Sequence, residues 1–206
     1  PWIRTLAVAL LWGAVAIPAA RAASLPSFAA VQASHQSSDV NVLDRRGEVM
    51  QTVRRDMSVR RLPWVSLSDI SPAMRTAIVL SEDQRFWQHS GVDWQAVAGS
   101  AWGNLWNQKT RGASTVTMQL AGLVGDSPNT GASRRNWSQK MTQAWRAAQL
   151  ERHWRKSDIL EAYLNLVPFR GEAVGLAAMS QTLFRKHPSG LEAQEEAIAA
   201  PLVRGP

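Results

Sequence analysis

The stretch that decides the fold spans residues 71–93 and reads SPAMRTAIVLSEDQRFWQHSGVD. Ser71 followed by Pro72 is typical of an N-cap and the first position of a helix, so we expect a helix over 73–81. The apolar run 77–80 is followed almost at once by Glu82 and Asp83. A carboxylate pair at the end of a buried helix is unfavourable unless it is solvated, paired or used in chemistry.

The two carboxylates are therefore the first candidates for a catalytic site. Glu82 is placed to act as a general base, and Asp83 to orient an arginine or a substrate hydroxyl. Each also has a structural interpretation, as a carboxylate paired with an arginine or as a capping aspartate. His89 follows in the same run, and no second histidine stands at metal-ligand spacing, which favours a hydrogen-bonding histidine over a zinc ligand.

A second unusual run, RGASTVTMQL, covers residues 111–120. Gly112 and the hydroxyls of Ser114 and Thr115 indicate a loop that enters a helix, where backbone amides and hydroxyls hold phosphate or sugar oxygens. The Lys-Ser/Thr ending of a nucleotide P-loop is missing. A simple N-cap is the alternative. Further on, Lys140 suits a pyrophosphate, with a solvated basic helix face as the alternative.

Composition narrows the class of protein. The 206 residues fit one domain with a sizeable core. A net charge of +7, from 23 basic and 16 acidic residues, suits an anionic partner such as a lipid surface or a pyrophosphate. No nucleic-acid-binding signature accompanies the charge. The absence of cysteine excludes a disulfide framework, a thiol nucleophile and a cysteine-based metal site.

The N-terminal residues predict the compartment. Residues 6–20 are almost wholly apolar, with Arg4 before them and Arg21 after them. We interpret residues 1–22 as a transmembrane signal anchor or a signal peptide, with a buried core helix as the alternative. Residues 23–39 are rich in Ala, Ser and Gln and are expected to be an irregular linker. The rest of the chain would then lie outside the cytoplasmic membrane.

The remaining pattern is mainly helical. β-Branched residues on both sides of the turn 44–47 predict a small hairpin. Apolar residues at helical spacing predict further helices over 94–106, 133–154, 158–165 and about 191–200. Asp93, Ser133 and Ser157 are their expected N-caps. The expected apolar stripe of the second of these helices consists of Trp137, Met141, Ala144, Trp145 and Ala148. Most tryptophans are expected in the core or in interfaces.

Taken together, these motifs resemble the peptidoglycan glycosyltransferase domain (family 51) of class A penicillin-binding proteins, from about Leu43 to the end. The matching residues are Glu82-Asp83, Phe86, His89, Gly91 and Asp93; Gly112-Ala113-Ser114-Thr115, Thr117 and Gln119-Leu120; Lys140 and Gln143-Ala144-Trp145; and Ile159-Leu160-Glu161 and Tyr163-Leu164-Asn165 with Pro168-Phe169 and Gly171. Three features look most like the penicillin-binding protein 1C branch: Met118, the run Gln143-Ala144-Trp145, and the pair Pro168-Phe169.

The resemblance implies a mainly α, lysozyme-like helical domain with a small N-terminal β-hairpin, preceded by a membrane anchor. The glycosyltransferase domain would cover residues 40–206, shortened at its C-terminus and without a transpeptidase domain. It would lie on the periplasmic, outer face of the cytoplasmic membrane. There it would polymerise lipid II into glycan strands with inversion at the anomeric carbon and release undecaprenyl pyrophosphate.

The resemblance also implies roles for individual residues. Glu82 would be the catalytic base, with Asp83 and Gln143 in the catalytic set. The residues that would bind the substrate are Phe86, His89, Arg111, Gly112, Ser114, Thr115, Thr117, Gln119, Lys140 and Asn165. No metal ligand is implied and no cofactor is required, although a divalent cation (Mg or Mn) is compatible with the family. The implied partners are lipid II, the growing glycan strand, moenomycin-type inhibitors, the cytoplasmic membrane and other cell-wall synthesis proteins, with no nucleic acid.

Gln143 departs from the family pattern, in which most members have a second glutamate at this position. A glutamine does not titrate, although it still forms hydrogen bonds. Glu151 is a poor substitute by spacing. Two other functions therefore stay open at this stage: a lysozyme-like enzyme that cleaves glycan, and an inactive membrane-anchored module that binds glycan.

Overall fold

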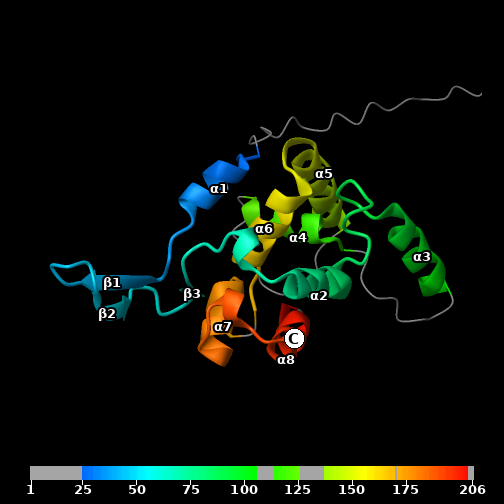
Figure 1. Cartoon of the computed structure of the whole chain (residues 1–206). Helices are drawn as coiled ribbons and strands as arrows, with labels where there is room; N and C mark the ends of the chain where they lie inside the picture. Colours follow the sequence, from blue (N-terminus) through cyan, green and yellow to red (C-terminus); the bar gives the residue numbers. More distant parts are fainter. Residues whose placement is uncertain (1–24, 106–113, 126–136, 170, 204–206) are drawn as a thin grey trace, which may run out of the picture.

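The computed structural model describes residues 25–105, 114–125, 137–169 and 171–203, with the backbone alone for 100–105 and 137–140. Over these residues the fold is mainly helical, as predicted (Figure 1). The α-helices are α1 (Phe28–Ser34), α2 (Pro72–Glu82), α3 (Trp94–Leu105), α4 (Val116–Val124), α5 (Trp137–His153), α6 (Lys156–Leu166), α7 (Leu176–Phe184) and α8 (Ala193–Ala199). The strands and 3-10 turns are β1 (Asp39–Leu43), β2 (Val49–Arg54), β3 (Arg60–Arg61), β4 (Ala173–Val174), η1 (Leu67–Asp69), η2 (Pro188–Gly190) and η3 (Ala200–Val203).

The hairpin and the helix α2 confirm two predictions. β1 and β2 pair antiparallel around the turn at 44–47 and project from one side of the helices, opposite α3 (Figure 1). The Ser71 hydroxyl caps α2 by accepting a hydrogen bond from the Met74 amide at 3.0 Å. Pro72 occupies the first turn, where its missing N–H has no intrahelical partner to lose. The helix buries Met74, Ile78 and Val79 and ends at Glu82.

Helix α6 forms as predicted, but its expected cap is wrong. The helix begins at Lys156, so Ser157 already lies inside it. The Asp158 carboxylate accepts hydrogen bonds from the Arg155 backbone amide at 3.2 Å and from the Arg155 guanidinium. Asp158, at the third position of the helix, therefore accepts the hydrogen bond of the backbone amide that precedes the helix, and the expected cap Ser157 is not needed for it.

The expectation of an irregular stretch over 23–39 is wrong for α1. Ser27 caps this helix through the Ala30 amide at 3.2 Å. Phe28 packs edge-on against Trp154, with ring centroids 5.6 Å apart, and Trp154 donates a hydrogen bond to the Pro26 carbonyl at 3.2 Å. Contacts with a residue far along the chain thus stabilise a segment whose composition reads as a linker.

The core lies around α4, which packs against both α5 and α6, while α2 packs against α8 and η3 (Figure 1). The predicted apolar face of α6 is confirmed, because Ile159, Leu160, Tyr163 and Leu164 are fully buried. Short parallel strands β3 and β4, which were not predicted, join residues 60–61 to 173–174.

The apolar stripe expected for α5 is wrong at Met141 and Trp145, while Ala144 packs against the core and the side chain of Trp137 lies outside the described residues. Among the α5 side chains that the structure describes, from 141 on, those of Ala147 and Leu150 are fully buried, whereas Met141 and Trp145 are exposed. Trp87 and Trp94 are exposed as well. These three tryptophans therefore lie on the surface rather than in the core.

Several expectations concern residues that the structure does not describe. The predicted anchor at 1–22 and the predicted cap Ser133 both lie outside the described ranges. Among the described residues, no helix has the length and hydrophobicity that crossing a bilayer requires.

Candidate active site

Glu82 lies where α2 meets α4. As the last residue of α2, it is half-buried, and its Oε2 accepts a hydrogen bond from Gln119 Nε2 of α4 at 3.1 Å. The other end of the same amide, Gln119 Oε1, accepts a hydrogen bond from the Tyr163 hydroxyl of α6 at 3.0 Å. The two predicted motifs thus meet directly at the residue predicted to be the base.

Asp83 connects the same two motifs through the backbone. It ends α2, with its amide donating to the Val79 carbonyl at 2.7 Å. Its buried carboxylate accepts hydrogen bonds from the Val116 amide, at the start of α4, and from His89 Nε2, each at 3.0 Å. An acid at a helix N-terminus also complements the helix dipole. Asp83 therefore takes the capping role, and among the described residues it pairs with His89 and not with an arginine.

His89 and Phe86 pack beneath this cap. Phe86 is fully buried, and its ring lies edge-on to the His89 ring at 6.5 Å. Because the Asp83 carboxylate accepts from Nε2, that nitrogen bears a proton. His89 Nδ1 is a buried atom with no hydrogen-bond partner among the described residues. Buried polar atoms are rarely left in this state, so the ring has an unused position at the predicted site.

The start of α4 is held by Thr115. Its hydroxyl accepts a hydrogen bond from the Met118 amide at 3.1 Å and donates one to the Gly91 carbonyl at 2.6 Å. The predicted loop running into a helix is confirmed in its described part, with Thr115 as the N-cap. Ser114 is half-buried and lies immediately before that cap.

Thr117 points into a partly buried ionic cluster. Its hydroxyl donates to Glu151 of α5 at 2.7 Å, and Glu151 also pairs with Lys156 of α6 at 2.7 Å. The Lys156 ammonium lies 4.4 Å from the centre of the Phe86 ring, a cation–π distance. Glu151 thus connects α4, α5 and α6 through these two contacts.

Gln143 of α5 lies against α4. A Cβ built at Gly122 would come 2.9 Å from Gln143 Nε2, so the glycine provides the room for this side chain. Gly122 and Gln119 are three residues apart and therefore adjacent on α4. Gln143 consequently lies one turn along α4 from the residue that contacts Glu82.

Three of the predicted binding residues are not placed by the structure. Arg111 and Gly112 lie outside the described residues. Lys140 lies in the first turn of α5, and the position of its side chain is not described. Their assignment stays a prediction.

Asn165 is taken up by the fold. Its Oδ1 accepts a hydrogen bond from the Val65 amide at 2.9 Å, and its Nδ2 donates to the Val65 and Glu161 carbonyls at 2.8 and 2.9 Å. The side chain is buried and its amide pairs with backbone groups at both ends. The structure gives Asn165 a structural role, and its assignment to substrate binding stays a prediction.

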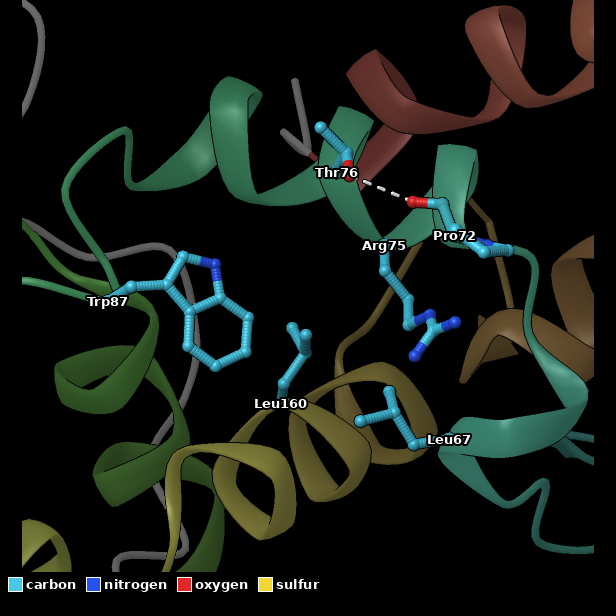
Figure 2. A pocket seen from close by; sticks show the side chains of 6 residues that line it. All are labelled: Leu67, Pro72, Arg75, Thr76, Trp87 and Leu160. Atoms are coloured by element: carbon cyan, nitrogen blue, oxygen red, sulfur yellow. Dashed lines mark hydrogen bonds between the residues drawn. The ribbon is translucent and has the colours of Figure 1, made fainter.

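A recess of about 240 Å³ opens beside α2, η1 and α6 (Figure 2). Arg75, Trp87 and Leu160 are among the side chains that line it. Arg75 is seven residues before Glu82 in the same helix, so the two lie on nearly the same face, about two turns apart. The recess therefore offers apolar surface and one cation on the Glu82 side of α2.

Sequence reasoning missed Tyr163, Glu151 and Lys156 as parts of this site. Tyr163 is the single tyrosine of the chain and stands on the predicted core face of α6. A hydroxyl on a buried face needs a polar partner, and that requirement was the available signal.

Among the described residues, no group of three or more histidine, cysteine, aspartate or glutamate side chains could hold a metal ion.

Comparison with known proteins agrees with this geometry. A family model described as a transglycosylase matches residues 46–206. Penicillin-binding protein 1C of Escherichia coli (strain K12) is 39% identical over 143 residues, 69% of this chain and 18% of that protein. Penicillin-binding protein 2D of Bacillus subtilis (strain 168) is 37% identical over 145 residues, 69% of this chain and 20% of that protein.

A shorter relative is also similar. The protein named biosynthetic peptidoglycan transglycosylase of Mannheimia succiniciproducens is 35% identical over 147 residues, which is 69% of this chain and 57% of that protein. The chain thus spans about a fifth of the two penicillin-binding proteins and just over half of the shorter relative.

Proposed function

The chain belongs to the transglycosylase family, and from this premise we propose that it polymerises lipid II into glycan strands and releases undecaprenyl pyrophosphate. The name of the shorter relative, biosynthetic peptidoglycan transglycosylase, supports the direction of the reaction, which is synthesis rather than cleavage. The chain would serve cell-wall synthesis as a glycosyltransferase.

One observation carries the proposal: the hydrogen bond between Glu82 and Gln119. It joins the carboxylate of the first motif to the amide of the second, 37 residues apart in the chain. An amide that donates to a carboxylate restricts its orientation, which supports a role for Glu82 as a general base.

The reaction follows from that base. The Glu82 carboxylate takes the proton of the acceptor 4-hydroxyl while the hydroxyl oxygen attacks the anomeric carbon of the lipid-linked donor. The new glycosidic bond forms as the bond from that carbon to the pyrophosphate oxygen breaks, with inversion. The electron pair leaves with undecaprenyl pyrophosphate.

The leaving pyrophosphate would bind at the start of α4. Ser114 lies there, and its hydroxyl is the group offered to the anion, because the Val116 and Met118 amides of the first turn already donate to Asp83 and Thr115. Thr115 and Thr117 would act indirectly, because their hydroxyls hold Gly91 and Glu151. Arg111, Gly112 and Lys140 would complete the anion site, and Gln143 would assist as a hydrogen-bonding group.

Lipid II and the growing strand are the proposed partners, at the periplasmic face of the cytoplasmic membrane. Residues 1–22 would supply the anchor or the signal peptide. Moenomycin-type inhibitors would compete for the site, and other cell-wall synthesis proteins would act beside it. The proposed chemistry requires no cofactor. Whether the polymerisation rate depends on Mg or Mn is tested by adding a metal chelator to the assay.

Labelled lipid II tests the proposal directly. The wild-type chain should produce polymer, and Glu82→Gln should reduce its rate by about a hundredfold or more, because the variant lacks the base. Glu48→Gln, in the exposed hairpin turn, is the matched control and should leave the rate unchanged.

Two other outcomes would contradict the proposal. Shortening of pre-formed glycan strands would identify a glycan-cleaving enzyme instead. Retained binding of glycan with no turnover in the wild-type chain would identify a binding module.

A further inference from the structure

Two hydrogen bonds in series end at the Glu82 carboxylate. The Tyr163 hydroxyl donates to Gln119 Oε1 at 3.0 Å, and Gln119 Nε2 donates to Glu82 Oε2 at 3.1 Å. The three residues come from α6, α4 and α2. Tyr163 of the core helix α6 is thereby connected to the proposed base Glu82 through Gln119.

The two ends of the glutamine amide are chemically opposite. The Nε2 end is a donor and the Oε1 end is an acceptor, so only one orientation of Gln119 attracts an ionised Glu82. In the other orientation a carbonyl oxygen would face the carboxylate and repel it. The ionised carboxylate only accepts and so selects the Nε2 end, and a group that holds the Oε1 end then keeps the amide in place beside Glu82.

Tyr163 is suited to fix that orientation. Its side chain is fully buried and its hydroxyl needs a partner inside the protein. Donation from this hydroxyl to Oε1 satisfies the acceptor end of the amide and leaves the donor end for Glu82. The tyrosine ring itself is held by the packing of α6, which keeps the hydroxyl in place.

We propose that Tyr163 is a positioning residue for the reaction: its hydroxyl, acting through Gln119, fixes the Glu82 carboxylate in the orientation that accepts the proton. This inference rests on the proposed function, because it requires Glu82 to be the base. Tyr163 touches neither the substrate nor the reacting atoms, so its effect should be on turnover and not on binding.

Kinetics of the full chain with lipid II test the proposal. Tyr163→Phe keeps the ring and removes the hydroxyl, and should lower kcat roughly tenfold with KM unchanged, as expected for one lost hydrogen bond to a group that holds a charge. Gln119→Met removes both ends of the amide and should lower kcat at least as much. The double variant should resemble Gln119→Met alone, because the proposed effect of Tyr163 on Glu82 passes through Gln119.

A matched control separates positioning from stability. Ser180 in α7 also has a buried hydroxyl, which donates to the Lys186 carbonyl at 2.7 Å. Ser180→Ala should lower the unfolding temperature without changing kcat. Equal kcat losses in Ser180→Ala and Tyr163→Phe, or independent and multiplicative losses in the double variant, would overturn the proposal.

A measurement without turnover distinguishes this proposal from the proposed function. In protein with ¹⁵N-labelled glutamine, the side-chain NH₂ signal of Gln119 should shift in Tyr163→Phe and in Glu82→Gln, and stay in Ser180→Ala. An unchanged signal and unchanged kcat in Tyr163→Phe would refute the positioning role while the wild type still polymerises lipid II. An inactive wild type that shows the shifts would refute the proposed function and leave the orientation by Tyr163 established.

Discussion

Gly91 allows the loop after Glu82 and Asp83 to lie directly against α5. Its φ of +92° is in the region that favours glycine, and a Cβ there would come within 2.8 Å of the Ala147 backbone. Its carbonyl accepts the Thr115 hydroxyl at 2.6 Å. One residue without a side chain therefore brings the first motif into contact with both the second motif and the helix of the third.

Gly91→Ala should be much more destabilising than a comparable change elsewhere. Gly47 in the hairpin turn has a φ of +82° but no atom within 4 Å of a built Cβ, so Gly47→Ala measures backbone strain alone, about 1–2 kcal/mol. Gly91→Ala adds the clash with α5, about a further 1–3 kcal/mol. Urea unfolding of both variants measures the difference, and equal losses would show that the close approach contributes nothing.

At the scale of elements, Asp93 links the first motif to helix α3. Its carboxylate accepts the Ala96 amide at 2.8 Å and pairs with the Arg85 guanidinium. Burial would raise the pKa of Asp93, but the Ala96 amide and Arg85 together hold this pKa below its ordinary value. Asp93 is thus confirmed as the predicted N-cap of α3, and the folded protein favours the charged form of its carboxylate.

Asp93→Asn should make this contribution visible as a dependence on pH. A carboxyl group with a lowered pKa in the folded state stabilises the fold above its unfolded pKa of about 3.9, and the effect is lost as pH falls through the folded pKa. Asparagine keeps the acceptor for Ala96 and removes the charge. Near pH 7 the variant should be less stable by about 1 kcal/mol, since Arg85 is partly exposed.

The difference in the free energy of unfolding between wild type and Asp93→Asn should begin to narrow below about pH 4, where the carboxyl of the unfolded chain becomes protonated, and should be lost as pH falls through the lower pKa of the folded state. Denaturant unfolding at a series of pH values measures it. A gap that stays constant from pH 7 to pH 3 would mean that the asparagine disturbs packing rather than charge.

Elements with strong local signals could be predicted from the sequence, and those stabilised by distant contacts could not. Helix α2 has a serine cap and proline at its start, which act within a few residues, so its position followed directly. Helix α1 depends on Phe28 meeting Trp154, and no local pattern announces a contact across that much of the chain. The register of α5 was misread because Trp145 is exposed while Ala147 and Leu150 are buried.

In the candidate site, too, some features could be predicted from the sequence and others could not. Glu82, Asp83 and Gln119 were recognisable because they stand within ordered runs of unusual residues. Their contacts with one another, and the contact with Tyr163, depend on how α2, α4 and α6 pack, which a single sequence does not specify. The structure gives Asp83 a structural role at the start of α4, and the catalytic assignments of Asp83 and Glu82 stay predictions.

At the scale of the whole molecule, helix α8 supports helix α2 at the end of α2 that lies opposite Glu82. Helix α8 packs against α2. The buried Glu196 of α8 accepts a hydrogen bond from the Ser71 hydroxyl, which caps α2. Glu82 stands at the opposite end of α2, so the C-terminal residues and the proposed base are connected through one helix.

Glu196→Ala should therefore loosen α2 as well as α8. Ser71 would lose a charged partner in a buried place, a loss of about 1–3 kcal/mol in the free energy of unfolding. Hydrogen exchange of the α2 amides should speed up, starting from the turn that Ser71 caps, and lipid II polymerisation should fall with it. Gln194→Ala, at an exposed position of α8, is the matched control and should change none of these. If Glu196→Ala speeds exchange in α8 alone, the two helices are not coupled and Glu82 depends only on the contacts at its own end of α2.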